Sequence, residues 1–356
     1  MRIPFSYIWR SLWARRLSTA LTVGGVALVV FVFAGVLMLA RGLEAALVET
    51  GSPDNVIVLR RSATSELSSQ VDRATADVLE AESGVARGAE GRALLSREVV
   101  LVIDLFKKKS NALGNVSIRG VSPRALELRS GVHIVQGRPF QFGTHEVVVG
   151  KGIATLFKGV ALGAELAFGG DRWTVVGIAD AGGTAFDSEI WGDVDQFMQA
   201  FGRPVYSSLT FHLAQPGGFD QLKARLQADP RMQYVELKHE RAYYQEQSKT
   251  LATFIRTLGI IVTTIFSFGA MIGAMITMYA AVVGGALGVA LAALLSFERI
   301  SVVNFQSFSE IGFGFALSPG VIARALIFAV VMGVVGGFLP AVRAARLNIV
   351  NALRAS

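Results

Sequence analysis

The chain has 356 residues, of which 52% are hydrophobic and 17% are charged, a charged fraction well below the ~25% usual for a soluble domain. Its net charge of +7 resides in its two ends: residues 1–16 carry four arginines and residues 343–356 carry three, without one acid, which leaves 27 basic and 27 acidic residues between them. The basic balance is therefore no sign of a nucleic-acid partner, and the absence of cysteine excludes disulfides and thiol chemistry.

Three uncharged runs are long enough, or nearly so, to cross a bilayer, which takes about 20 apolar residues. They are Leu17–Ala40, Thr257–Phe297 and Ala325–Val342. The arginine-rich ends follow the positive-inside pattern and predict that both termini are cytoplasmic, which requires an even number of spans. A cleaved signal peptide is the alternative for the first run, but that run is longer than a signal core and lacks a small-x-small cleavage site.

The N-terminal residues place aromatic side chains on one face of an amphipathic helix beside a basic cluster. This pattern predicts an elbow helix at the membrane surface, and the predicted interface anchors are Trp9, Trp13, Arg15 and Arg16. An ordinary helix packed on a partner is the alternative.

The region between the first two apolar runs has the composition of a soluble domain. Two strand–helix–strand units are expected in it: strand 55–60 with helix 67–81, and strand 207–213 with helix 217–229 and strand 233–238. They predict a porter-like α/β fold. The turn-rich stretch 131–202 between them predicts a mostly β insertion.

The 41-residue uncharged run Thr257–Phe297 is too long for one span, because a single helix would measure about 61 Å against a ~30 Å hydrocarbon core. We therefore expect two helices and four spans in all. The stretch between them, Tyr279–Gly285, has no charge or proline, and the helix after it is short. We expect that a polar segment is missing here and that the chain is broken between Ala280 and Gly285.

Motifs for catalysis and cofactor binding are absent from the sequence. The nearest approach to a P-loop, "HEVVVGKG", has His145 and Gly152 where glycine and Ser/Thr are needed. The four histidines are scattered without metal-ligand spacing, and no Gly-x-Ser-x-Gly elbow occurs. We expect no catalytic, metal or cofactor residue in this chain.

Taken in order, the segments resemble the MacB/FtsX/LolC-type permease subunits of ABC transporters. The resemblance covers the whole chain and is carried by "NVIVLR", "VSIRGVSP", "HEVVVGKGIATLF", "GAMIGAMITMYAAV" and the closing "GGFLPAVRAARLNIVNALR", in which Ile349 replaces a usual proline. In that family a polar cytoplasmic stretch with a coupling helix follows "MYAAV", which supports the expected missing segment near residue 282.

The resemblance implies a membrane α-helical protein of the bacterial inner membrane, with four spans, cytoplasmic termini and a large periplasmic α/β porter-like domain with a β insertion. The expected segments are an elbow 1–16, span and stalk 17–43, periplasmic domain 44–250 (porter-like 44–130 and 203–250, insertion 131–202), spans 251–281 and 282–297, periplasmic loop 298–319, span 320–342 and tail 343–356.

The resemblance also implies the function: a permease that transmits the motion of a partner ATPase to its periplasmic domain, which acts on a periplasmic or membrane-derived substrate. The implied partners are a dimer of cytoplasmic ABC ATPase subunits, which binds the ATP, a second copy or homologous permease, membrane lipids and a periplasmic adaptor protein. Small residues Gly269 and Gly273 are expected at the dimer interface. An FtsX-like activator of a periplasmic cell-wall hydrolase is the alternative, and the sequence leaves the substrate open.

Overall fold

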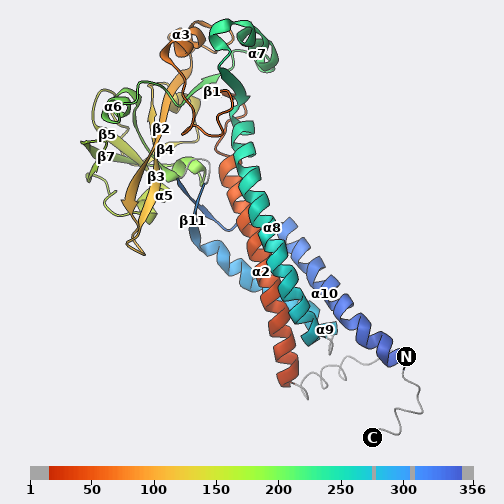
Figure 1. Ribbon diagram of the computed structural model, residues 1–356. Helices are drawn as coiled ribbons and strands as arrows, with labels where there is room; N and C mark the ends of the chain where they lie inside the picture. The colour runs from red at the N-terminus through yellow and green to blue at the C-terminus, as the bar shows by residue number, and fades with distance from the viewer. Residues whose placement is uncertain (1–15, 275–277, 305–308, 347–356) are drawn as a thin grey trace, which may run out of the picture. The chain divides into compact units, whose positions relative to one another are not determined.

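The computed structural model describes residues 16–274, 278–304 and 309–346 (Figure 1). The chain divides into two compact units. The first comprises residues 1–42, 252–299 and 314–356, and the second comprises residues 43–251 and 300–313.

The second unit is built on one ten-stranded sheet in the order β10-β1-β9-β2-β3-β8-β5-β7-β4, with β6 on β7. The strands are β1 Asn55–Arg60, β2 Leu95–Phe106, β3 Leu113–Val121, β4 His133–Gly137, β5 Glu146–Gly150, β6 Glu165–Phe168, β7 Asp171–Asp180, β8 Glu189–Asp193, β9 Ser208–His212 and β10 Val235–His239. Its helices are α3 Arg73–Ala81, α4 Ala125–Leu128, α5 Lys151–Leu156, η1 Ala185–Ser188, α6 Val194–Ala200, α7 Phe219–Ala228 and η2 Pro230–Met232.

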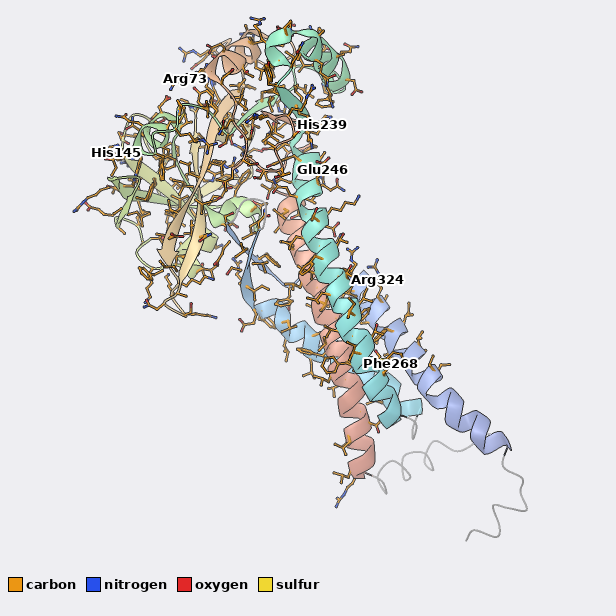
Figure 2. All side chains as sticks on the ribbon, viewed as in Figure 1. Arg73, His145, His239, Glu246, Phe268 and Arg324 are labelled. Carbon is orange, nitrogen blue, oxygen red and sulfur yellow. The ribbon has the colours of Figure 1, made fainter. Side chains whose placement is uncertain are left out.

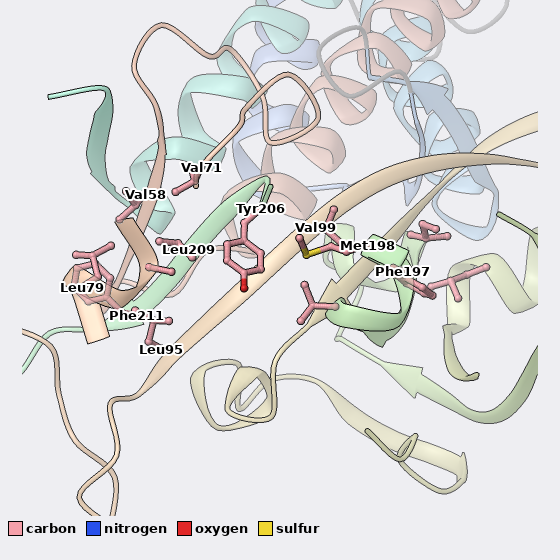
Figure 3. Packing of buried hydrophobic residues seen from close by; sticks show 14 of the residues in the cluster. Val58, Val71, Leu79, Leu95, Val99, Phe197, Met198, Tyr206, Leu209 and Phe211 are labelled. Atoms are coloured by element: carbon pink, nitrogen blue, oxygen red, sulfur yellow. The ribbon is translucent and has the colours of Figure 1, made fainter. Parts of the chain in front are cut away.

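The sheet is buried on both faces, and its central strands alternate between two hydrophobic cores. In β1, Val56 and Val58 face one core while Ile57 and Leu59 face the other. Figure 3 shows the first core, where Leu79 of α3 and Phe197 of α6 pack on the strands with Leu209 and Phe211 of β9. Val, Ile and Leu at successive positions are the pattern expected of such doubly covered strands.

The predicted strands and helices of the second unit largely form where the sequence places them, with one difference at α3. This helix begins at Arg73 rather than near residue 67, because the Asp72 side chain accepts the Thr75 N–H at 2.7 Å and caps the helix there.

The β-rich segment 131–202 does not form a sheet of its own, as an insertion would. Its strand β8 pairs in parallel with β3, from Ser117↔Glu189 to Val121↔Asp193, so its strands extend the same sheet. Alternating residues identify a strand but not its partner, since pairing between distant segments depends on the complete fold.

The first unit consists of helices: α2 Arg16–Val48, α8 Glu240–Ala274, α9 Met278–Leu294 with η3 Leu295–Phe297, and α10 Pro319–Arg346, the first two of which begin or end in the second unit. Two of them contain segments long and apolar enough to cross a membrane, Ala20–Val48 and Glu240–Phe268, among the residues that the structure describes. Val283–Phe297 and Pro319–Val335 are shorter apolar helices.

The predicted break between Ala280 and Gly285 is wrong, because α9 is one uninterrupted helix from Met278 to Leu294. Its glycines let α9 approach α2 closely. A Cβ on Gly284 would lie 2.8 Å from the Val23 carbonyl oxygen, and one on Gly288 would lie 2.6 Å from the Ala27 carbonyl oxygen. Residues 275–277, between α8 and α9, lie outside the described residues.

The segment expected as a simple loop, 298–319, contains two paired strands, β11 Arg299–Val303 and β12 Glu310–Gly314. Most of this hairpin, residues 300–313, belongs to the second unit. It connects α9 to α10, so the chain passes between the two units four times rather than twice.

Candidate functional site: a buried charge network at the start of α8

Six charged side chains meet in the interior of the second unit, where ionised groups are rarely found unless they are paired. They are two arginines and four glutamates that come from separate elements, and each is less than a tenth exposed. The glutamates are Glu66 after β1, Glu98 in β2, Glu189 in β8 and Glu240, the first residue of α8; the arginines are Arg119 in β3 and Arg129 after α4.

Arg119 is the centre of the network and uses every N–H of its guanidinium. Its Nε and Nη2 donate to Glu189 at 2.7 and 2.9 Å. Its Nη1 and Nη2 donate to Glu66 at 2.7 and 2.9 Å, and Nη1 also reaches Glu98 Oε2 at 2.6 Å. These forked, charge-assisted bonds fix the geometry as well as the charge.

Arg129 continues the network from the sheet to α8. Its guanidinium binds both oxygens of Glu98, and its Nη2 donates to Glu240 Oε1 at 3.1 Å. The ring of Phe186 lies 4.9 Å from the guanidinium carbon and that of Trp191 lies 5.6 Å from it. The aromatic faces stabilise the cation from the side that the carboxylates leave open.

Neutral donors complete the environment of Glu240. Its Oε2 accepts the Ser52 backbone N–H at 3.1 Å and Asn55 Nδ2 at 2.9 Å. Asn55 also donates to the Leu128 carbonyl oxygen at 2.9 Å. The first residue of α8 is thus bound to the loop after α2, to β1 and, through Arg129, to β2.

Glu66, Arg119 and Arg129 have pKa values shifted in the direction that keeps them ionised, whereas burial raises the pKa of Glu240. Burial raises the pKa of Glu66, but the charge of Arg119 and its hydrogen bonds outweigh this effect, and the pKa lies below its usual value. Burial lowers the pKa of Arg119, and Glu189 and Glu66 more than offset it, so that its pKa is well above normal. The pKa of Arg129 is raised because Glu98 and Glu240 likewise outweigh burial.

The β11–β12 hairpin binds the same region. Lys107 Nζ pairs with Glu310 at 2.7 Å, and the Gly312 N–H donates to Ser188 Oγ at 2.9 Å. A cavity of about 40 Å³ lies between this hairpin and the network, and its walls include Arg119, Tyr243, Ile311 of β12, and Asn304 and Ser309 next to the two strands. That volume is sufficient for water, which needs ~15 Å³ by this measure.

The residues expected as sites from the sequence lie elsewhere. Trp9, Trp13 and Arg15 fall outside the described residues, and Arg16 is the exposed first residue of α2. Gly269 and Gly273 lie in α8, in its part for which burial is not described. Their roles stay predictions.

The histidines are held in separate places. His145 packs on Trp173, His239 packs on Phe219, and Figure 2 shows these two far apart in the second unit. His212 contacts Asn55 through Nδ1 at 3.1 Å. Within residues 16–274, 278–304 and 309–346, no group of three or more His, Cys, Asp or Glu side chains is placed to hold a metal ion.

The charge network was not identified from the sequence, although a signal for it exists. Glu98 and Arg119 stand next to apolar runs in two strands, "SREVVLVIDLF" and "VSIRGV". A charged residue at a strand position that should face a core indicates either that the strand lies at the edge of the sheet or that the charge is paired inside the protein. The partner could not be named, because the six residues are spread over 175 positions from Glu66 to Glu240.

The arrangement is suited to holding elements together rather than to chemistry. Glu98, Glu189 and Glu66 are each bound by an arginine and closed off from solvent, so none is placed as an accessible base. The network instead fixes the first turn of α8 to three neighbouring strands of one sheet.

Comparison with known proteins gives one family. The family model of the MacB-like periplasmic core domain matches residues 19–229. Among solved structures, the chain is similar to the periplasmic region of MacB from Actinobacillus actinomycetemcomitans, with 12% identity, coverage of 55% of this chain and 94% of that one, and a TM-score of 0.41. It is also similar to the extracellular domain of the noncanonic ABC-type transporter YknZ from Gram-positive bacteria, with 15% identity, coverage of 52% and 99%, and a TM-score of 0.39. No curated protein matches the chain.

The network makes a prediction about stability. Replacing Glu66 with Gln leaves Arg119 buried with one carboxylate fewer and should cost about 3–5 kcal/mol of unfolding free energy at neutral pH. Glu165→Gln, in the exposed pair with Arg172, should cost less than ~1 kcal/mol. Denaturant unfolding followed by the fluorescence of buried Trp173 and Trp191 measures both.

Wild type and Glu66→Gln together also test the direction in which the pKa of Glu66 is shifted. Because the pKa of Glu66 is lowered on folding, its stabilising contribution is present above the unfolded value and is lost as pH falls through the folded value. The difference between wild type and Glu66→Gln should therefore shrink below about pH 4.5. A difference that grows on acidification would contradict the assignment.

Proposed function

Because the chain belongs to the family of proteins with a MacB-like periplasmic core domain, as its sequence resemblance predicted, we propose that it is the membrane permease subunit of an ABC transporter. In this proposal a cytoplasmic ATPase dimer, and not this chain, binds and hydrolyses ATP. The chain transmits the resulting motion to its periplasmic domain, which acts on a periplasmic or membrane-derived substrate.

The observation that carries the mechanism is the attachment of α8 to the sheet. Glu240 is bound by Arg129 and Asn55 inside the second unit, and α8 continues as one helix to Ala274. A helix of 35 residues measures about 52 Å. No proline interrupts it, so a displacement at one end would be delivered to the network at the other.

The proposal places α2, α8, α9 and α10 across the bacterial inner membrane, with both termini in the cytoplasm and residues 50–245 in the periplasm. The two longest apolar segments, Ala20–Val48 and Glu240–Phe268, support the first two crossings. The arginine-rich chain ends support the orientation. The shorter helices α9 and α10 would make the remaining two.

The proposal also includes a dimer formed through α8. Five large apolar residues of this helix are 51–66% exposed in the single chain at intervals of four and three residues: Phe254, Leu258, Ile261, Ile265 and Phe268. This is the spacing of a helix–helix seam. Gly269 and Gly273 follow it directly and would let two copies approach closely.

In the FtsX-like alternative, the same attachment of α8 to the sheet, here called the joint, serves to activate a cell-wall hydrolase instead of moving a substrate. The two functions share the ATP-driven motion and differ only in what the periplasmic domain contacts. A periplasmic adaptor protein is a further candidate partner of the transporter.

Transmission is testable because the chain has no cysteine, so that Ser83→Cys carries a single spin label. In the complex with the ATPase, ATP should shift the distance between the labels of the two copies. Arg129→Gln should abolish that shift while ATP hydrolysis continues, because the first turn of α8 is released from Glu98. Lys151→Gln, which breaks only a partly exposed pair with Asp180, is the matched control. An unchanged shift in Arg129→Gln would exclude the network as the joint.

Topology is tested by reporter fusions at Ser62 and after Ser356. We expect activity of a periplasmic reporter at Ser62 and of a cytoplasmic reporter at the C-terminus. A cytoplasmic signal from Ser62 would overturn the four-span arrangement.

The dimer is tested by replacing Gly269 and Gly273 together with Leu, which should force the two α8 helices apart and yield monomers in detergent. Gly288→Leu is the control, because Gly288 packs on α2 of the same chain and its replacement should lower thermal stability without separating the copies. Unchanged dimerisation of the double variant would show that the seam lies elsewhere.

A further inference from the structure

The hairpin between β2 and β3 projects from the sheet as a two-stranded ribbon (yellow in Figure 1). On one side β9 pairs only with Leu95–Glu98, and on the other β8 pairs only with Ser117–Val121. The rest of β2 and β3 pair with each other as far as Phe106↔Leu113, and beyond Phe106 the chain also pairs with the segment at the end of α5, through a bridge between Lys107 and Phe157. We call residues 105–113, "LFKKKSNAL", the β2–β3 tip.

The tip combines exposed apolar side chains with positive charge. Phe106 and Leu113 lie directly opposite each other in the ladder and are 51% and 59% exposed. Lys107, Lys108 and Lys109 follow Phe106, and residues 105–113 contain no acid. An exposed apolar pair with lysines around it is suited to binding, since large apolar side chains that stay in contact with water gain free energy when a partner surface covers them.

The tip is held in a fixed shape rather than left loose. The Lys107 N–H donates to the Ala112 carbonyl oxygen at 2.9 Å, and Asn111 takes a positive φ of 54° that closes the turn. Lys158 Nζ donates to Asn111 Oδ1 at 2.8 Å, and Lys108 Nζ donates to the Ala154 carbonyl oxygen at 2.6 Å. A pre-shaped surface loses less entropy when it binds.

An ion pair between the tip and the β11–β12 hairpin indicates which surface the tip contacts. Lys107 pairs with Glu310 of β12, and β12 belongs to the hairpin that joins the apolar helices α9 and α10. Nine residues after Glu310, α10 begins at Pro319. The tip is therefore tied by an ion pair to the segment that connects two proposed membrane helices.

We propose that the β2–β3 tip docks on the surface of the lipid bilayer, with Phe106 and Leu113 at the level of the headgroups and Lys108, Lys109 and Lys158 against anionic lipid phosphates. Aromatic and aliphatic side chains partition into this zone, and lysines reach past them to the phosphates. The inference rests on the membrane insertion in the proposed function. It adds to the periplasmic domain a second support, beside α2 and α8, that depends on lipid charge.

The test uses the complete chain in lipid nanodiscs, with a fluorophore at Ser110→Cys and a nitroxide quencher on the lipid headgroups. In discs with about one third phosphatidylglycerol in phosphatidylcholine, quenching at residue 110 should exceed that at Gln215→Cys by about threefold. Gln215 follows β9 at the opposite end of the β2 strand, since Phe211 pairs with Leu95, so it reports a part of the same sheet without the tip.

Charge and apolar contacts are separated by variants. Discs of phosphatidylcholine alone supply the uncharged reference. Lys108→Glu with Lys109→Glu should remove the extra quenching in the discs with phosphatidylglycerol, and Phe106→Ser with Leu113→Ser should lower the quenching in both kinds of disc. Arg73→Glu with Arg92→Glu makes the same change of charge at exposed positions away from the tip and should have no effect.

Insertion of the chain is measured independently by a probe at Leu28→Cys, an exposed position in the apolar part of α2, with quenchers on the acyl chains. Quenching there without quenching at residue 110 overturns the docking of the tip and leaves the proposed function intact. No quenching at residue 28 overturns the membrane insertion itself. Quenching at residue 110 that is unchanged in the lysine variants overturns the role of anionic lipid. If only an added acidic protein protects residue 110, the tip binds a protein partner and the docking on lipid is overturned.

Discussion

The architecture of the second unit depends on the cost of leaving a charge unpaired in a protein interior. Arg119 and Arg129 are buried among strands of one sheet and are stable there only because four glutamates converge on them from other segments. A buried ion pair adds little net stability compared with apolar packing, but the loss of one member is severe. The network therefore acts as a constraint on geometry: β2, β3, β8 and α8 must meet at this point.

This constraint distinguishes the start of α8 from an ordinary helix start. A first turn held by hydrophobic packing alone could slide, because such contacts tolerate small shifts in register. Glu240 instead accepts three directed hydrogen bonds, from Ser52, Asn55 and Arg129, and any displacement would break them inside a protein interior, where an unpaired charge is costly. A joint with this property would move as a whole with the sheet, as the proposed transmission of motion requires.

Glycine has the corresponding role in the first unit, where apolar surfaces offer no directed bonds. Gly284 and Gly288 bring α9 against the backbone of α2, and Gly259 of α8 faces Val36 so closely that a Cβ would overlap its side chain. Helices in lipid associate through such close packing, since burial of apolar surface gives no advantage there. The two units are thus held together internally by different forces, ion pairs in one and backbone contact in the other.

The sequence by itself determined the class of the protein and most of its local elements. Uncharged runs, arginine-rich ends and alternating strands are local patterns, and the strands at Asn55–Arg60 and Ser208–His212 formed where they predicted. The ordered motifs also identified the family. Only the tertiary structure decided that segment 131–202 joins the main sheet through β3 and β8, that α9 is unbroken through Gly285, and that Glu66, Glu98, Arg119, Arg129, Glu189 and Glu240 share one interior. The physical reason is the same in each case: strand pairing, helix contact and charge pairing join residues distant in the chain, and a local pattern indicates that a partner is needed without indicating which residue it is.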